Sequence, residues 1–381
     1  MSANTPGPAP RRGRPVEVES LAQFDALVAG GAGSIRGWRL QGVDLTDRSE
    51  VLAGLRPAGA IFLGCRLGPG VGERMRAGGA LVFPAIPDVP FDPYRSALYD
   101  AGELYDGVAT QPYEDTTDAL VYAWTRRTDT ERELHATLAT ALHDHAISDA
   151  LEETLRDGAL AGRDVIGVMG GHDVGRTDRA FGDAAYLARR LARAGLLVAT
   201  GGGPGAMEAA NLGAYLADID EDDLDKALRR LADVASFVPS VTDWARAAVD
   251  VLADHPAGTA NLGIPTWFYG HEPPNLFATH VAKYFANPVR EARLLRVCTA
   301  GIVFLPGAAG TVQEIFQDAC ENYYAPDGAV APMVLVGRAH WDEQVPAWPL
   351  LRSLGAGRAM GERIWCVETV EEAYELVATG R

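Results

Sequence analysis

The sequence predicts a Rossmann-like α/β fold: a doubly wound parallel sheet with helices on both faces, accompanied by a smaller N-terminal α/β region. Two observations lead to this prediction. From residue 164 onwards, short and wholly apolar segments alternate with helical patterns, as they do in βαβ units. Three of these segments run directly into glycine-rich turns, at 170–171, 201–205 and 307–310. Apolar runs of this kind are typical of strands buried on both faces of a parallel sheet.

The first part of the chain is less regular. Residues 1–15 are rich in Pro, Gly and Arg, a composition that predicts disorder. Residues 16–115 alternate short apolar runs with Gly and Pro, which predicts a small α/β region without a catalytic cluster. Apolar residues from 115 to 157 recur at helical spacing. No long-period repeat is evident.

The Rossmann-like domain is predicted over residues 116–381. Its strands are expected at 165–169, 196–200, 263–268, 301–305, 332–336 and 364–367. Its helices are expected at 179–194, from 206, from 279 to 296 with Lys283 on it, after 311, and after 369. An acidic segment opens a helical insertion at about 218–258, which is either solvated surface or a lid or subunit contact.

Composition limits the partners. The 381 residues include 34 Lys and Arg against 51 Asp and Glu, a net charge of −17, which repels nucleic acid and anionic lipid. A small anionic ligand is compatible with this charge, because backbone dipoles make local positive sites. The four cysteines are widely spaced without a C-x-x-C pair, which argues against a zinc cluster or a disulfide scaffold. With no signal peptide and no run of about 18 apolar residues, we expect a cytoplasmic protein without a metal, a cofactor or a membrane span.

The glycine-rich turns are the candidate ligand site, because ligands bind at the carboxyl ends of strands in an open parallel sheet. Glycine allows close approach of the backbone, and the following helix N-termini favour phosphate. The candidate contacts are Gly170, Gly171, Gly201, Gly202, Gly203, Gly205, Gly307, Gly310 and the hydroxyl of Thr311. For the first turn, Gly170 and Gly171, close packing is an equal alternative. Neither longer turn is a P-loop, because no lysine follows, and neither continues as a dinucleotide-binding motif.

Glu314 lies three residues after Thr311, in the first turn of the expected helix. A carboxylate there is either a favourable charge at the helix N-terminus or a group placed beside the sugar of a bound nucleotide. In the second position it can stabilise a developing oxocarbenium ion or orient a water molecule at the anomeric carbon.

The two longer turns resemble motifs of the Lonely Guy (LOG) family. Residues 306–314, Pro-Gly-Ala-Ala-Gly-Thr-Val-Gln-Glu, resemble its P-G-G-x-G-T-x-x-E motif, and 201–208 resemble its glycine loop in the P-G-x-M-E form. The resemblance covers roughly residues 160–375. It implies cleavage of the N-glycosidic bond of a nucleoside 5′-monophosphate, giving free base and ribose 5-phosphate, by a homodimer or higher homo-oligomer. Larger relatives are bacterial nucleotide 5′-monophosphate nucleosidases.

The resemblance also implies roles for single residues. Glu314 matches the catalytic carboxylate, and the arginine on the preceding helix is Arg290, with Arg293 as the alternative. Phosphate or substrate contacts are implied for Glu208, Ala308 and Ala309 within the motifs. Ala308 departs from the family, which has glycine there, and His172 replaces a small hydroxyl residue. The aromatic run of Trp267, Phe268, Tyr269 and His271 either stacks on a base or packs in the core.

Three other functions are weighed against the hydrolase. A non-catalytic nucleotide sensor or cofactor carrier of the same fold, like the molybdenum-cofactor carrier proteins, is the main alternative, with Ala308 as its support. A protein that processes single-stranded DNA is disfavoured by the net charge. Decarboxylation with pyridoxal phosphate needs a Schiff-base lysine, and the two lysines, Lys226 and Lys283, lie away from the glycine turns.

Overall fold

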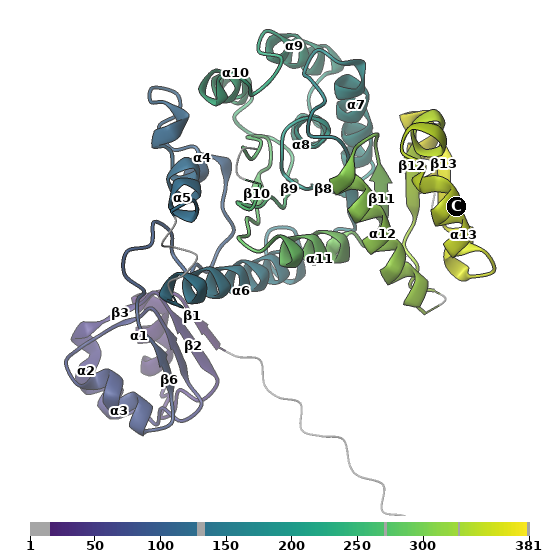
Figure 1. Cartoon of the computed structure of the whole chain (residues 1–381). Coiled ribbons are helices and arrows are strands. Elements are labelled where there is room, and N and C mark those ends of the chain that lie inside the picture. The colour runs from purple at the N-terminus through teal and green to yellow at the C-terminus, as the bar shows by residue number, and fades with distance from the viewer. Residues whose placement is uncertain (1–15, 128–133, 270–272, 327, 379–381) are drawn as a thin grey trace, which may run out of the picture. The chain divides into compact units, whose positions relative to one another are not determined.

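The computed structural model describes residues 16–127, 134–269, 273–326 and 328–378 (Figure 1). The segment 1–15 and His271 lie outside the described residues. The chain divides into two units, Met1–Ser96 and Ala97–Arg381. This boundary is earlier than the predicted one at 115/116. The segment that follows Ser96 belongs to the second unit, as the pairing of Tyr99 with Val281 shows. Tyr99 donates its N–H to the carbonyl of Val281 at 3.0 Å and accepts the N–H of Val281 at 2.8 Å.

The first unit has a parallel sheet in the order β1-β2-β4-β6 and a two-stranded sheet, β3-β5. Its strands are β1 Val16–Val18, β2 Trp38–Gln41, β3 Asp44–Leu45, β4 Ile61–Leu63, β5 Arg66–Leu67 and β6 Leu81–Phe83. Its α-helices are α1 Leu21–Ala29, α2 Ser49–Ala53 and α3 Val71–Ala77. Phe24, Trp38, Leu40, Phe62 and Met75 belong to its own buried core.

The first unit is built from stacked repeats, so the expectation of no long-period repeat is wrong here. Gly37, Gly59 and Gly79 precede β2, β4 and β6, at intervals of about 20 residues, and all have positive φ. The parallel register then places Leu40 beside Phe62, and Phe62 beside Val82. Matching positions share only glycine or apolar character, and this similarity is too weak to stand out in the sequence.

The second unit has a seven-stranded sheet in the order β10-β9-β8-β7-β11-β12-β13, and every neighbouring pair is parallel. Its strands are β7 Val165–Met169, β8 Leu197–Thr200, β9 Leu262–Gly263, β10 His280–Val281, β11 Gly301–Phe304, β12 Met333–Val336 and β13 Ile364–Val367. All five residues of β7 are buried, as expected for a central strand covered on both faces. The predicted parallel α/β fold is confirmed.

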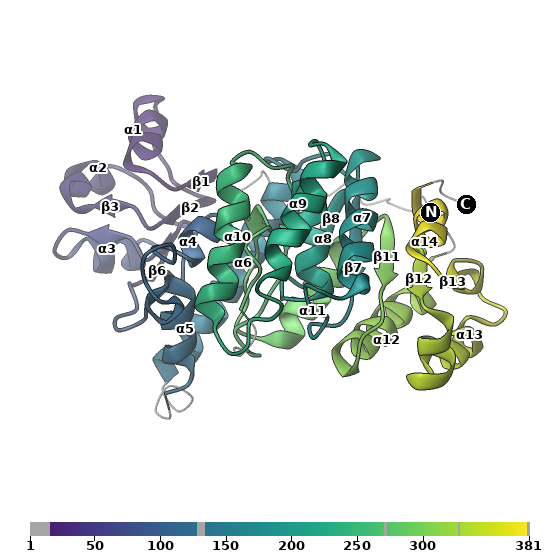
Figure 2. The same cartoon turned by 90° about the horizontal axis from the view of Figure 1, so that it is seen from above.

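Helices cover both faces of this sheet (Figure 2). On one face, α7 Arg179–Arg193 packs against α8 Ala206–Tyr215 and α14 Val370–Ala378. On the other face, α12 Ala309–Tyr324 packs against α11 Asn287–Val297 and α13 Ala347–Gly355. The remaining α-helices are α4 Ala101–Leu104, α5 Thr117–Thr125, α6 Leu134–Arg156, α9 Glu221–Ala232 and α10 Val241–Asp254, the last two inside the predicted insertion.

The segment between β9 and α11 differs from the prediction. The expected strand at 263–268 ends at Gly263, and the expected helix from 279 starts only at Asn287. Residues 280–281 pair with β9 instead, and Pro288 in the first turn fixes the start of α11. Lys283 therefore lies between a strand and a helix, and it is buried.

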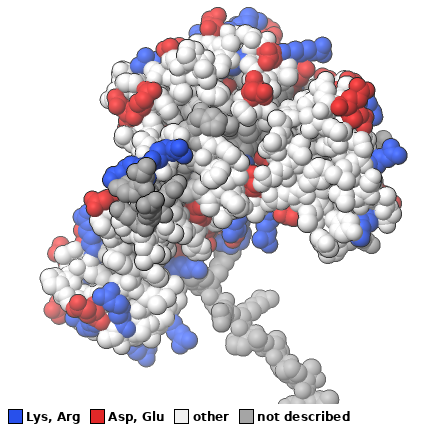
Figure 3. All heavy atoms as spheres, in the orientation of Figure 1, with Lys and Arg blue, Asp and Glu red and all other residues white. Residues whose placement is uncertain are grey.

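Charged side chains of both signs are interspersed on the face drawn in Figure 3. Within the described ranges, no helix is long and apolar enough to span a membrane.

Candidate functional site

The chain reverses direction across the sheet between β7 and β11. After β7 the chain adds β8, β9 and β10 on one side, and it then crosses back to place β11 on the other side of β7. Gly170 and Gly171 follow β7, and Pro306 to Thr311 follow β11. Gly171 donates its N–H to the carbonyl of Pro306 at 3.0 Å, which joins the two loops. A switch point of this kind is where open α/β sheets bind ligands.

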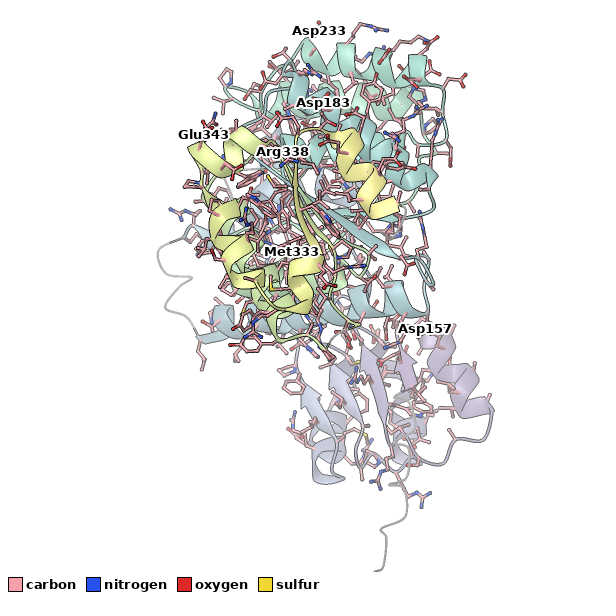
Figure 4. The ribbon with its side chains drawn as sticks, turned by 90° about the vertical axis from the view of Figure 1, so that its right-hand side faces the viewer. Asp157, Asp183, Asp233, Met333, Arg338 and Glu343 are labelled. Carbon is pink, nitrogen blue, oxygen red and sulfur yellow. The ribbon has the colours of Figure 1, made fainter. Side chains whose placement is uncertain are left out.

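The carboxyl-end edge of the sheet can be located in Figure 4. Met333 is the first residue of β12, and Arg338 comes two residues after its last residue, Val336. Arg338 and Glu343 lie toward the edge that carries the glycine loops, whereas Asp157, which precedes β7, lies toward the opposite edge.

A cavity of about 290 Å³ lies at this switch point. The predicted site residues that line it are Gly170, Gly171, Gly201, Gly203, Arg290, Ala308, Ala309, Gly310, Thr311 and Glu314. The other lining residues are His172, Asp173, Met207, Pro265, Thr266 and Tyr269. A larger depression of about 1110 Å³ is lined by α13 and the 3₁₀ helix η5 Ala359–Glu362, and none of the predicted residues line it.

The loop after β11 presents the N-terminus of α12 to the cavity. The N-cap residue, Ala308, has no polar side-chain atom and makes no side-chain cap hydrogen bond to the first N–H groups of α12. Gly307 is required by packing, because a Cβ atom there would lie 2.2 Å from the Thr311 hydroxyl oxygen. Ala308 has a negative φ of −110°, so the left-handed conformation that favours glycine is not needed at the position where the LOG motif has glycine.

The glycines of the loop after β8 have two different roles. Gly201 and Gly203 line the cavity, whereas Gly202 and Gly205 shape the turn. Gly205 has φ +70°, and a Cβ atom there would lie 2.5 Å from the carbonyl oxygen of Gly171, so only glycine fits. The next residue, Ala206, donates its N–H to that same oxygen at 3.0 Å. Gly202, Gly205 and Gly307 thus hold the loops together and do not line the cavity.

Glu314 and Arg290 form the charged pair of the cavity. Arg290 Nη1 lies 3.4 Å from Glu314 Oε1, and the two side chains are 8% and 10% exposed. Burial raises the pKa of the Glu314 carboxyl to about 7, although the charge of Arg290 opposes the shift. The carboxyl therefore changes its charge near neutral pH, the range in which an acid–base group is most effective.

Glu291 is a second buried carboxylate beside this pair, and the sequence analysis missed it. It accepts hydrogen bonds from Asn287 Nδ2 at 2.9 Å and from Gln313 Nε2, which ties α11 to α12. Its charge also contributes to the raised pKa of Glu314. Arg290 donates to Asn287 Oδ1 at 2.8 Å through Nη2 and to Glu314 through Nη1, so two partners hold the guanidinium in place. No local pattern marks Glu291, because its role depends on how α11 packs against α12.

Two further predicted contacts also lie outside the cavity. Glu208 does not line the cavity, because its carboxylate pairs with Arg176, at 2.5 Å from Nη2, and both side chains are 1% exposed. Arg176 also donates to the carbonyl of Trp244 on α10, so this pair anchors the helical insertion. Arg293 lies three residues after Arg290 on α11 and pairs with Glu152 of α6, away from the cavity.

The aromatic run divides between the cavity and the core. Tyr269 lines the cavity, whereas Trp267 is buried and stacks on Phe285 with ring centroids 4.6 Å apart. Asp118 accepts the Trp267 Nε1–H at 2.9 Å and pairs with the buried ammonium of Lys283. Phe268 is exposed and does not line the cavity.

The fold and the cavity together define a parallel α/β protein with a cavity at its switch point. Among the residues that the structure describes, no group of three or more His, Cys, Asp or Glu side chains is arranged to hold a metal ion.

No protein-family model and no curated protein matches this chain. Among solved structures, it is similar to the molybdenum cofactor binding protein of the phototrophic bacterium Rippkaea orientalis, with 16% sequence identity and a TM-score of 0.35 over 57% of this chain and 96% of that chain. It is also similar to the molybdenum cofactor carrier protein of Chlamydomonas reinhardtii, with 19% identity and a TM-score of 0.36 over 57% of this chain and 99% of that chain.

Proposed function

We propose that this protein is a nucleoside 5′-monophosphate phosphoribohydrolase of the LOG family. The observation that carries the proposal is the position of Glu314: a buried carboxyl with a pKa of about 7 lines the same cavity as the uncapped N-terminus of α12. One short segment thus supplies both an anion cradle and an acid–base group, which is the combination that the hydrolysis of a phosphorylated sugar needs.

The phosphoryl group binds at the first turn of α12, where the N–H groups, the helix dipole and the Thr311 hydroxyl favour a dianion. The ribose then extends toward Glu314. As the bond between C1′ and the base nitrogen breaks, its electron pair leaves with the base, and the Glu314 carboxylate stabilises the positive charge on the sugar. A water oxygen bonds to C1′, Glu314 accepts the water proton, and solvent supplies a proton to the base.

Arg290 has two functions in this scheme. Its charge favours the ionised form of Glu314, and its bonds to Asn287 and Glu291 fix the direction of the guanidinium. Cleavage of this kind needs neither a metal nor an organic cofactor. We propose that the protein works in the cytoplasm as a homodimer or higher homo-oligomer.

A carrier or sensor that binds a nucleotide or a cofactor without turnover is the second candidate. The observation that favours it is the ion pair itself, because the guanidinium of Arg290 engages the carboxylate that the hydrolase would use. In this candidate the pair closes the cavity around a phosphorylated ligand and performs no chemistry.

One experiment separates the two candidates. The protein is incubated with AMP, GMP, CMP, UMP and IMP, and free base is measured by chromatography, while calorimetry measures binding to the same nucleotides. The hydrolase releases base, and Glu314→Gln abolishes release while binding persists. Glu321→Gln, an exposed change on the same helix, is the matched control. Full base release by Glu314→Gln would refute the catalytic role, and binding by the wild type without release would favour the carrier.

A further inference from the structure

The loop after β11 contacts a histidine that lies beyond the neighbouring strand. β12 ends at Val336, and Gly337, with φ +92°, leads into a single π-helical turn, η4 His340–Gln344. His340 Nε2 lies 2.9 Å from the carbonyl oxygen of Gly307 and 3.3 Å from the nitrogen of the same residue. Turns of π-helix are rare and are frequently found at functional sites.

The imidazole of His340 is held in place from two other directions. The ring of Trp341, which is fully buried, meets it edge-on, with centroids 4.5 Å apart and an interplanar angle of 88°. His340 Nδ1 lies 3.2 Å from Gln344 Oε1, one turn along the π-helix. A ring fixed in this way presents Nε2 to the loop in a single direction.

Gly307 is the residue through which His340 acts on the loop. A carbonyl oxygen only accepts hydrogen bonds, so the shorter contact forms in the tautomer that carries Nε2–H. In the other tautomer Nε2 accepts the Gly307 N–H at 3.3 Å, so the ring is bonded to the same residue in either form. Gly307 immediately precedes the N-cap of α12, and packing against Thr311 already restricts it to glycine. Any rotation of the Gly307 peptide would therefore redirect the first N–H groups of α12 away from the cavity.

We propose that His340 is a positioning residue for the anion cradle: its bond to the Gly307 carbonyl holds the Pro306–Thr311 loop in the conformation that receives a phosphate monoester. The assignment of a phosphate to this loop rests on the proposed function. The contact between His340 and Gly307 does not.

His340→Ala removes the donor and loosens the loop. The Kd for ribose 5-phosphate and the KM for the nucleotide each rise about tenfold, whereas kcat changes less, because Glu314 and Arg290 are untouched. Amide hydrogen exchange of residues 306–312 becomes faster while Tm stays close to that of the wild type. His340→Gln restores both readouts, because its side-chain amide can donate from the same position.

Calorimetry with ribose 5-phosphate and hydrogen exchange by mass spectrometry are performed on the wild type, His340→Ala, His340→Gln and Arg338→Ala. Arg338 is an exposed residue between the same strand and the same π-turn, so its variant should behave as wild type in both measurements. Slow exchange and wild-type affinity in His340→Ala would overturn the proposal, as would failure of His340→Gln to restore them.

The two proposals can fail separately. If the wild type releases no base and binds no ribose 5-phosphate, the proposed function fails, and loop exchange alone decides whether His340 fixes the loop. If His340→Ala lowers Tm strongly, Gln344→Ala replaces it, because that change frees the ring without removing it and should give a smaller increase in loop exchange.

Discussion

Arg290 Nη1 and Glu314 Oε1 lie 3.4 Å apart on the wall of the cavity that both residues line. One comes from α11 and the other from α12, so the pair depends on how these helices pack on the same face of the sheet. Burial and the neighbouring Glu291 raise the pKa of Glu314, and Arg290 lowers it. This balance governs the first two predictions.

Activity should depend on the ionisation of Glu314. The carboxyl must be ionised to stabilise a sugar cation, and its pKa is about 7. We therefore expect kcat/KM to rise with pH up to about 7 and then to level off, falling about tenfold for each pH unit below that limb. A pH–rate profile from 5 to 9 tests this. The second phosphate pKa of the nucleotide is about 6. A profile whose only midpoint lies at about pH 6 would therefore show that ionisation of the substrate, and not of Glu314, controls the rate.

Removing Arg290 should shift this profile and reduce the rate. Without the guanidinium the pKa of Glu314 rises further, so in Arg290→Ala the acidic limb should move to higher pH. The loss of one fixed charge from the site should lower kcat/KM roughly 10²- to 10³-fold. Arg293→Ala is the matched control on the same helix, because Arg293 pairs with Glu152 outside the cavity. Equal losses in the two variants would contradict the assignment of Arg290.

Asp318 should make stability depend on pH. Burial raises the pKa of this α12 carboxyl to about 8. The folded protein then binds more protons than the unfolded chain between pH about 4 and 8, so the free energy of unfolding falls as pH rises through that window. Asp318→Asn removes the contribution of this carboxyl to the pH dependence of the free energy of unfolding. Its stability relative to wild type should increase from pH 5 to pH 9 in urea titrations, by at most about 1.4 kcal/mol per pH unit. A constant difference across this range would contradict the prediction.

Glu208 should contribute to stability and not to ligand contact. Its carboxylate is buried against Arg176, and removing one partner of such a pair leaves an uncompensated charge. Glu208→Ala should cost about 3–5 kcal/mol in the free energy of unfolding. Lys226→Ala, which breaks the exposed pair with Asp223, should change stability little. Wild-type stability in Glu208→Ala, together with a raised Kd for nucleotide, would reverse the assignment.

Lys283 and Asp118 should behave as one unit. Lys283→Met leaves Asp118 buried without its cation and should cost about 3–5 kcal/mol. Asp118→Asn in the same chain removes the stranded charge and keeps an oxygen for Trp267 Nε1, so the double variant should recover much of the loss. Urea unfolding of the two single variants and the double variant measures the coupling. Additive losses would show that the two charges are independent.

Much of the fold and the glycine-rich loops of the site could be predicted, because both depend on local sequence patterns. Wholly apolar runs such as Val165–Met169 predict buried parallel strands, and glycines directly after them predict backbone that approaches a ligand. The segment around Lys283 could not be predicted, because its residues pair with β9 and with Tyr99, far away in the chain. The repeat of the first unit also escaped prediction, since Leu40, Phe62 and Val82 share little beyond apolar character.

The sequence by itself determined that this protein has a doubly wound parallel sheet and that Glu314 follows a glycine turn, because strand burial, turn geometry and helix phase are local properties. Only the tertiary structure decided that Arg290 and not Arg293 faces Glu314. It also decided that Glu208 forms an ion pair with Arg176 and that His340 contacts Gly307. These pairings depend on which strands become neighbours at the switch point and on how α11 and α12 are rotated against each other. No single segment encodes that information, because it arises when the whole core packs.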